Sequence, residues 1–372
     1  MLELSFNDYY LINSHKEVFL FKKTEDEKVE SSSLDFISQE SVYLYSTTID
    51  SDDNIYIIIL SKSGDLNLYT RLNNMFSKIN IAKFDLVTNN YKQLEIKIAN
   101  EKVNIFYSYY NTGVANILSI QHIVVSKTIE EKHNVVRYAS QSITGPFILD
   151  IDSNGNVHMI YNNNSQVFYN SYNPYSKKWN KPISRISKEE TINKSPYIFV
   201  DSKDNIHCLW IIKVKGKSFI RHNKMSTKGK DSFNWRDIKL PQITSTDIIP
   251  IVFQKEDILK LIYLENDKVN FLYSTDSGST WIKDEAIIDS IVKGPIINSG
   301  SNLEDESKYN HLFAELSNIV DLNLNIRNEI ELSEEETLIE DVLDDAVAIL
   351  VEEDFSESKI KEEYEETLDI IL

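Results

Sequence analysis

The sequence predicts an all-β protein of the β-propeller class, with seven four-stranded blades followed by a short acidic helical segment. Three observations lead to this expectation. A unit of strand, polar turn and strand recurs about every fifty residues, tryptophans recur late in successive units, and the spacing of apolar residues becomes helical after residue 328. Two sandwich domains are the alternative, but they would show turns about every 8–12 residues without the long period.

The repeat is clearest in three polar turns that each lead into an apolar strand. Each turn opens with an aspartate, whose carboxylate can accept hydrogen bonds from backbone N–H groups further along the turn, and closes with an asparagine. The first two turns lie about twice as far apart as the last two, so a further unit is expected between them, and 98–107 supplies it with a shortened turn. The expected turn residues are Asp50, Asn54, Asp152, Asn156, Asp201 and Asn205.

The same frame extends toward both ends of the chain. One copy stands at 11–21 and another at 253–262, and a last unit follows residue 294, where 309–315 and 319–326 are expected to be strands. These copies bring the predicted number of blades to seven, with six as the alternative if the first copy only decorates the closure. The short strand 2–6 is expected to complete the last blade and to cover edges that an open array would expose.

The most specific motif is the turn that follows the alternating strand 269–274. An aspartate there can accept backbone hydrogen bonds, and a glycine can take the positive φ that a tight turn requires. The pattern Ser-x-Asp-x-Gly-x-Thr-Trp resembles the Asp-box of sialidase-like β-propellers. The matching residues are Ser274, Asp276, Gly278, Thr280 and Trp281. In that family the box is a structural turn on the outer rim of a blade, so the resemblance implies a scaffold.

The resemblance does not extend to the sialidase active site. Sialidases of this fold bind the substrate carboxylate with three arginines, the first of which stands in an Arg-Ile-Pro motif. Here Arg185 is followed by Ile186, but Ser187 stands where the proline should be. No catalytic residue is therefore predicted, and the chain is expected not to be an enzyme. If it is one, the resemblance implies a glycoside hydrolase.

From residue 329 the chain is expected to be helical. Ser333 and Glu336 match a capping box at a helix start, and apolar residues then recur at spacings of three and four through 338–350. A second helix is expected after Ser356. The predicted domains are a propeller over 1–328 and an acidic amphipathic tail over 329–372. The apolar stripe of the tail is expected either to pack on the propeller or to engage a partner or another copy of the chain.

Charge and composition exclude several partners. The tail carries a net charge of −16 out of −19, which leaves −3 for the body. No basic stripe is present, so nucleic acid is not expected as a partner, and the acidic tail disfavours a membrane surface. The sequence has no secretory signal and no apolar run of about 18 residues, which predicts a cytoplasmic location with secretion left open. Cys208 is the single cysteine, so no intramolecular disulfide can form.

Neither a metal nor another cofactor is predicted. The aspartate turns resemble calcium loops, but Lys203 takes a ligand position in one of them and the closing glutamate is absent. His158 and His207 hold equivalent strand positions that Tyr56 fills in another unit, which favours a structural role over a metal-binding pair. The candidates for contact with a ligand are Tyr109, Tyr110, Tyr172, His158 and His207.

Two functions fit this sequence. The favoured one is a non-catalytic propeller that presents an interaction face to a protein partner, with the acidic tail as a second docking element. The alternative is a carbohydrate-active propeller, either a glycoside hydrolase or a lectin, because tyrosines exposed on a propeller could stack on sugars. The chain has 20 tyrosines and 16 phenylalanines, although most of them are expected to fill the space between sheets.

Overall fold

A computed structural model of the chain describes strands and turns between residues 9 and 313. The residues that it describes are 9–14, 17–23, 29–36, 41–50, 52, 54–72, 75–113, 117–139, 147–188, 192–214, 217–228, 233–241, 243, 250–265, 268–288, 296–298, 307–309 and 311–313. The chain divides into two compact units, Met1–Leu316 and Ser317–Leu372. The predicted strands 2–6 and 319–326, the tail 329–372 and its boundary lie outside the described residues.

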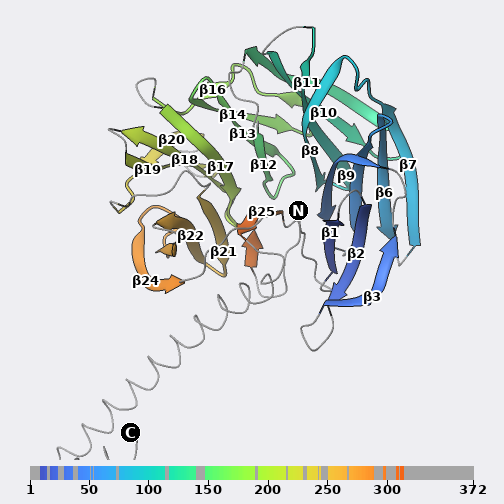
Figure 1. Ribbon diagram of the computed structural model, residues 1–372. Helices are drawn as coiled ribbons and strands as arrows, with labels where there is room; N and C mark the ends of the chain where they lie inside the picture. The colour runs from blue at the N-terminus through green and yellow to red at the C-terminus, as the bar shows by residue number, and fades with distance from the viewer. Residues whose placement is uncertain are drawn as a thin grey trace, which may run out of the picture. The chain divides into compact units, whose positions relative to one another are not determined.

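Five antiparallel sheets of four consecutive strands make up most of the described chain (Figure 1). The first contains β4 (Val42–Ile49), β5 (Ile55–Ser61), β6 (Asp65–Leu72) and β7 (Met75–Lys83). The second contains β8 (Asn89–Ala99), β9 (Lys102–Asn111), β10 (Ile117–Val125) and β11 (Ile129–Ala139). The third contains β12 (Phe147–Ile151), β13 (Val157–Asn163), β14 (Gln166–Asn173) and β15 (Lys178–Trp179), with β16 (Ser184–Arg185) also paired to β14.

The fourth and fifth sheets repeat this order. The fourth contains β17 (Ile192–Val200), β18 (Asn205–Val214), β19 (Lys217–Ser226) and β20 (Trp235–Ile238). The fifth contains β21 (Ile251–Lys255), β22 (Ile258–Glu265), β23 (Lys268–Ser274) and β24 (Ile282–Ile288). The repeat of about fifty residues seen in the sequence therefore corresponds to one sheet of four strands.

Burial along a strand depends on the place of the strand in its sheet. Second strands are buried on both faces, as in 57–61 of β5 and 205–212 of β18. The fourth strand β11 alternates between partly buried and exposed residues over 129–134. The continuous apolar runs of the sequence are thus strands that lie between two neighbouring sheets, and the alternating runs have one face in solvent.

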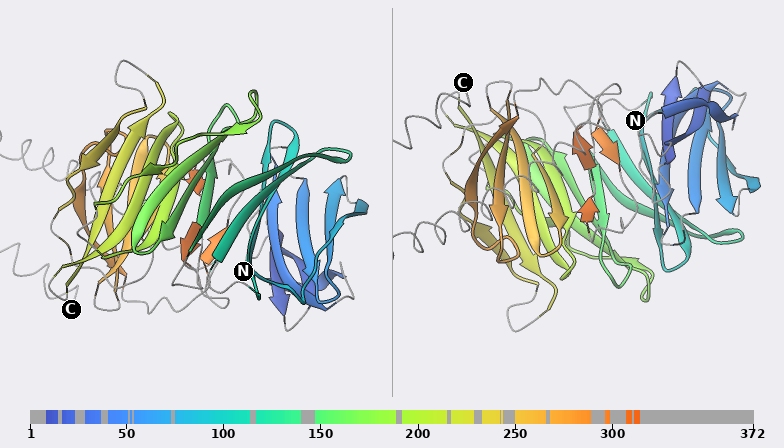
Figure 2. Two further views of the ribbon diagram at one scale, coloured as in Figure 1. Left: turned by 90° about the horizontal axis from the view of Figure 1, so that it is seen from above. Right: turned by 90° about the horizontal axis from the view of Figure 1, so that it is seen from below.

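Neighbouring sheets pack against each other in chain order, as the two views of Figure 2 show. An apolar cluster around Ile58 and Ile105 joins the first sheet to the second. A cluster around Phe106 and Phe147 joins the second to the third, and one around Cys208 joins the third to the fourth. Because these side chains interdigitate between two sheets, each sheet is stabilised mainly by burial against its neighbours.

Hydrogen bonds between side chains and backbone also tie the first strands of neighbouring sheets. Gln93 Nε2 of β8 donates to the carbonyl of Phe147 in β12 at 2.7 Å, and the amide of Val200 in β17 donates to Asp150 Oδ2 of β12 at 2.6 Å. Four-stranded antiparallel sheets that pack one after another, first strand beside first strand, are the blades of a β-propeller. The predicted fold class is confirmed for these five sheets.

The strands at either end of this array differ from the predicted frame. A three-stranded sheet of β1 (Tyr9–Ser14), β2 (Glu17–Lys23) and β3 (Val29–Phe36) stands where the first unit is expected. The predicted strand 309–315 is instead split in two. β26 (Ser307–Tyr309) pairs with β21, and β27 (His311–Phe313) pairs with β25 (Ile296–Asn298). The last unit therefore contributes its strands to two sheets.

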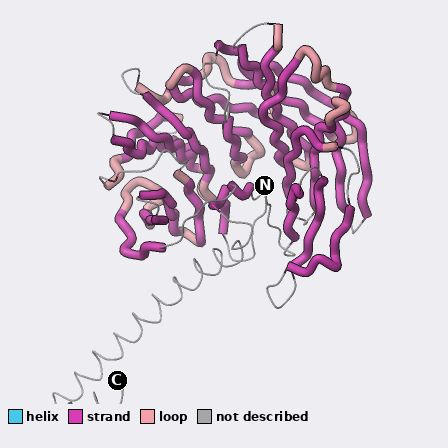
Figure 3. Tube along the Cα trace, viewed as in Figure 1, coloured by secondary structure: helices cyan, strands magenta, loops and turns pink. Residues whose placement is uncertain are grey.

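Figure 3 shows that the described part of the chain consists of strands and the loops that connect them. It contains no helix of the length and apolarity needed to cross a membrane.

Candidate functional site

The three predicted aspartate turns share one set of hydrogen bonds. In the turn after β17, Asp201 Oδ1 accepts from the backbone N of Lys203 at 2.9 Å and of Asn205 at 2.7 Å. Asp201 Oδ2 accepts from the side-chain amide of Asn205 at 2.8 Å. The turns that start at Asp50 and Asp152 contain the same three bonds. Each carboxylate is thus occupied in closing its own turn.

A side chain on the second strand also reaches each turn aspartate. The Tyr56 hydroxyl donates to the aspartate of its turn at 2.9 Å. His158 Nε2 and His207 Nε2 lie 3.3 Å and 3.2 Å from the aspartate oxygens of theirs. This explains why a tyrosine and two histidines share one position in the repeat, since all three can donate to a carboxylate.

Both histidines continue into a row of rings that ends on the next sheet. His207 Nδ1 lies 3.1 Å from Nε2 of His222 on β19, and His222 packs edge-on against Trp281 of the fifth sheet, with 5.6 Å between ring centroids. We call such an arrangement a polar row. The other polar rows are Asp152, His158, Tyr169 and Trp235, starting in the third sheet, and Asn104, His122 and Trp179, starting in the second.

The turn at 274–281 is built around Asp276 and packs on the fourth sheet. Asp276 Oδ1 accepts from the amides of Thr280 and Ser279 at 2.8 and 3.0 Å, and Oδ2 accepts from the Thr280 hydroxyl at 2.7 Å. Burial alone would raise the pKa of Asp276, but these hydrogen bonds lower it to about 2. Gly278, at φ +77°, lies against His207, where an added Cβ would come within 2.6 Å of the ring. The turn therefore joins two sheets.

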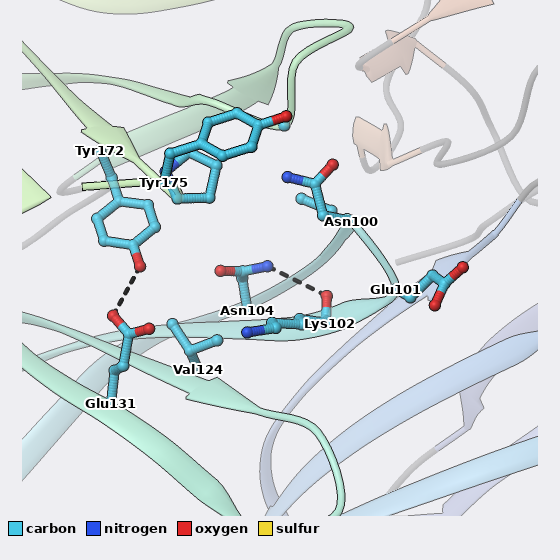
Figure 4. A pocket seen from close by; sticks show the side chains of 11 residues that line it. Asn100, Glu101, Lys102, Asn104, Val124, Glu131, Tyr172 and Tyr175 are labelled. Atoms are coloured by element: carbon cyan, nitrogen blue, oxygen red, sulfur yellow. Dashed lines mark hydrogen bonds between the residues drawn. The ribbon is translucent and has the colours of Figure 1, made fainter. Parts of the chain in front are cut away.

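A pocket of about 480 Å³ lies between the second and third sheets, at the shortened turn of the repeat (Figure 4). There β8 and β9 are joined by Asn100 and Glu101, both at positive φ, in place of a five-residue aspartate turn. The type I′ two-residue hairpin turn requires positive φ at both central residues, which asparagine tolerates well. The polar and aromatic residues that line the pocket are Asn100, Glu101, Lys102, Asn104, Glu131, Tyr172 and Tyr175.

Glu131 of β11 is held by three partners inside this pocket. Its Oε2 accepts from the Tyr172 hydroxyl at 2.7 Å, as Figure 4 shows, and from His133 Nε2 at 2.9 Å. Its Oε1 lies 3.2 Å from the ammonium group of Lys177. Burial alone would raise the pKa of Glu131, but the three partners together lower it. The carboxylate is therefore ionised at neutral pH and fixed in direction.

The polar row of the second sheet supports the wall of the pocket. Asn104, which lines the pocket, accepts at Oδ1 from His122 Nε2 at 3.0 Å. Trp179 Nε1 donates to Nδ1 of His122 at 3.3 Å. Because Nδ1 accepts this hydrogen bond, the hydrogen of the neutral His122 ring is on Nε2. Burial lowers the pKa of His122 well below its usual value, and the nearby His133 adds to this effect. A neutral ring in a fixed tautomer thus orients the Asn104 amide.

Tyr175 presents a largely exposed ring at the edge of the pocket, with 79% of its surface accessible. The turn that carries it is anchored by Asn173, whose Oδ1 accepts from the amides of Tyr175 and Ser176 at 3.1 and 2.8 Å. Asn173 Nδ2 in turn donates to Asn156 Oδ1 of the neighbouring aspartate turn at 2.9 Å. An exposed aromatic side chain on a well-bonded turn is a common contact point for ligands.

The structure separates the five residues predicted to face a ligand. Tyr172 lines the pocket and donates its hydroxyl to Glu131. Tyr109 packs among other tyrosines of β8 and β9, and Tyr110 packs against the apolar cluster between the second and third sheets. His158 and His207 are buried in polar rows, 4% and 0% exposed. Within the described ranges, no three metal-ligating side chains come together as a metal site requires.

Sequence reasoning missed Glu131, His133 and Tyr175. Glu131 and His133 are two residues apart on one face of β11, which the alternation of that strand could have indicated. The shortened turn at Asn100 was visible in the sequence as a departure from the repeat. Together with the alternation of β11, it could have indicated a site at this turn. Tyr175 follows a proline in a polar loop and belongs to no pattern that could have singled it out.

Comparisons with known proteins add no family. No protein-family model matches the chain, and a comparison with curated proteins finds no match. Among solved structures, an ulvan lyase of a new polysaccharide lyase family is 11% identical at a TM-score of 0.44, covering 77% of this chain and 83% of that one. AofleA from Arthrobotrys oligospora is 9% identical at 0.44, covering 78% and 86%. The WD40 domain of SCAP from fission yeast is 9% identical at 0.45, covering 85% and 74%. Such distant likenesses carry no conclusion about a ligand or a reaction.

Proposed function

We propose that the chain is a non-catalytic, carbohydrate-binding β-propeller and that the pocket between its second and third sheets is the binding site. The observation that carries the proposal is the combination in one pocket of an exposed ring, Tyr175, and an ionised, positioned carboxylate, Glu131. A sugar can place its C–H face against the ring while its hydroxyls donate to the carboxylate.

The other lining groups support a polyhydroxylated ligand. A sugar hydroxyl both donates and accepts hydrogen bonds, and the pocket offers an amide at Asn104, an ammonium group at Lys102 and a phenol at Tyr172. These groups come from strands and anchored turns, so little side-chain ordering is needed when a ligand binds. Such pre-organisation favours affinity for small polar ligands.

The state of Glu131 supports binding without hydrolysis. A glycoside hydrolase needs a carboxylic acid whose pKa is raised so that it can protonate the leaving group. The partners of Glu131 change its pKa in the opposite direction. The other lining carboxylate, Glu101, is exposed on a two-residue turn. We therefore assign the pocket to recognition.

We also propose that the propeller has seven blades, the number of units in the sequence. The sheet of β1, β2 and β3 and the pair of β25 and β27 would supply the two units beyond the five complete sheets, while β26 pairs with β21 of the fifth sheet. The prediction that 329–372 docks on a protein partner or on another copy is independent of the pocket and stays a second proposal.

Binding to a glycan array, followed by isothermal titration calorimetry with a saccharide that binds, tests the proposed function. Tyr175→Ala and Glu131→Gln are each expected to weaken binding about tenfold or more, because one removes the ring contact and the other a charged acceptor. Phe233→Ala is the matched control, since Phe233 is 70% exposed at the equivalent turn of the fourth sheet and does not line the pocket.

The control variant is expected to bind like the wild type. Full affinity in both pocket variants would place the binding site elsewhere, and no binding to any saccharide would contradict the proposed function.

A further inference from the structure

The charged groups at the pocket limit which sugars it can accept. Among the described charged side chains that line the pocket or form an ion pair with a lining side chain, three are carboxylates and two are ammonium groups, and the His133 imidazole contacts one of the carboxylates. They are Glu101, Glu130 and Glu131, and Lys102 and Lys177. The carboxylates therefore outnumber the ammonium groups before any ligand enters.

Both ammonium groups already have carboxylate partners. Lys102 Nζ lies 2.6 Å from Glu130 Oε2, and its hydrogen bond is the main cause that lowers the pKa of Glu130. Lys177 Nζ lies 3.2 Å from Glu131 Oε1. A sugar carboxylate could recruit either lysine only by taking it from one of these glutamates, which would exchange one ion pair for another and leave that glutamate without its ammonium partner.

The carboxylate of Glu131 adds direct repulsion. It is a hydrogen-bond acceptor only, and its side chain is 9% exposed. A second carboxylate placed a few ångströms away offers no proton to share at neutral pH and is repelled by the fixed negative charge of Glu131. A neutral hydroxyl at the same place donates a charge-assisted hydrogen bond instead.

We infer that the pocket selects uncharged saccharides over uronic and sialic acids. This inference rests on the proposed function and specifies the ligand class of the same site. It runs against the sialidase resemblance, whose arginine cluster serves an acidic sugar, and it agrees with the departure of Arg185, Ile186 and Ser187 from the arginine motif.

Titration calorimetry with matched pairs of saccharides tests this selectivity. The probes are methyl galactoside and methyl galacturonide, methyl glucoside and methyl glucuronide, and lactose and sialyllactose, each measured at pH 7.5 in low and in physiological salt. The neutral member of a binding pair is expected to bind about tenfold or more tightly. The difference in affinity between the neutral and the acidic member is expected to narrow at higher salt. It is also expected to narrow in Glu131→Gln, because that variant removes a repelling charge.

The outcomes separate the two proposals. If the acidic member binds as tightly as the neutral one or more tightly, and Tyr175→Ala abolishes that binding, the inference is wrong and the binding site stands. If the neutral member binds more tightly and the difference in affinity is unchanged in Glu131→Gln and at high salt, the electrostatic basis of the inference is wrong. If no saccharide of any pair binds and none binds on the glycan array, both the inference and the proposed function fail.

Discussion

His122 and His222 are imidazoles buried completely, each on the third strand of its sheet and each beside a tryptophan of the next sheet. Burial lowers the pKa of both well below the usual value, and the adjacent histidines lower it further. The folded chain therefore holds these rings neutral at a pH where the unfolded chain would protonate them. Buried histidines of this kind make the stability of the contact between two sheets depend on pH.

This link predicts a loss of stability in mild acid. Because the folded-state pKa values are depressed, the contribution of these histidines is complete above about pH 6.5 and falls as the pH drops below that value. For each ring that stays neutral in the folded chain, the free energy of unfolding falls by about 1.4 kcal/mol per unit decrease of pH in that range. Urea unfolding at pH 7.5, 6.5 and 5.5 measures the slope. The slope of the unfolding free energy against pH should fall by roughly half in His222→Phe. An unchanged slope in that variant would contradict the claim that the buried His222 ring causes the loss of stability.

Gly278 is a second residue whose role can be measured. Its positive φ and its contact with the His207 ring exclude a side chain. Gly278→Ala is expected to lower the free energy of unfolding by about 2 kcal/mol or more, because it combines backbone strain with a clash against a buried ring. Gly113→Ala is the control, since Gly113 meets only a flexible side-chain oxygen at 3.3 Å. Equal effects of the two substitutions in urea unfolding would argue against this role.

At the scale of elements, the aspartate turns are the feature that repeats. The three turns contain the same hydrogen bonds, but their aspartates are buried to different extents. Asp201 is 2% exposed, whereas Asp50 lies partly in solvent. Asp201→Ala is therefore expected to lower the free energy of unfolding by about 3 kcal/mol, and Asp50→Ala by about 1 kcal/mol. Only Asp201→Ala leaves buried donors without an acceptor. Thermal and urea unfolding of the two variants provide the comparison. A larger loss in Asp50→Ala would show that burial does not set the cost.

The sequence was informative about elements where local chemistry repeats. The aspartate turns, the apolar second strands and the fifty-residue period are all local features, so they could be read without a structure. The last unit could not be read in this way. Whether β26 pairs with β21 or with its own neighbours depends on which strand edge is open, and strand spacing in the sequence contains no information about that choice.

At the scale of the whole molecule, the candidate site arises from packing between blades. Glu131 belongs to the second sheet and Tyr175 to the third, and their meeting depends on how two units stack. The sequence indicated where the repeat is irregular, at Asn100, but the partner residues come from other turns of the repeat. This is why one residue that lines the pocket, Tyr172, was among the predicted candidates while Glu131 was not.

The central claim is that a saccharide binds between the second and third sheets. Methyl NMR on alanine- and valine-labelled protein tests it most directly, because Ala99 and Val124 line the pocket while Val200 and Val252 are buried in other sheets. Titration with the tightest-binding neutral saccharide is predicted to shift the Ala99 and Val124 methyl signals and to leave those of Val200 and Val252 unchanged. Unchanged signals from Ala99 and Val124 at saturating saccharide, with shifts elsewhere, would contradict the claim.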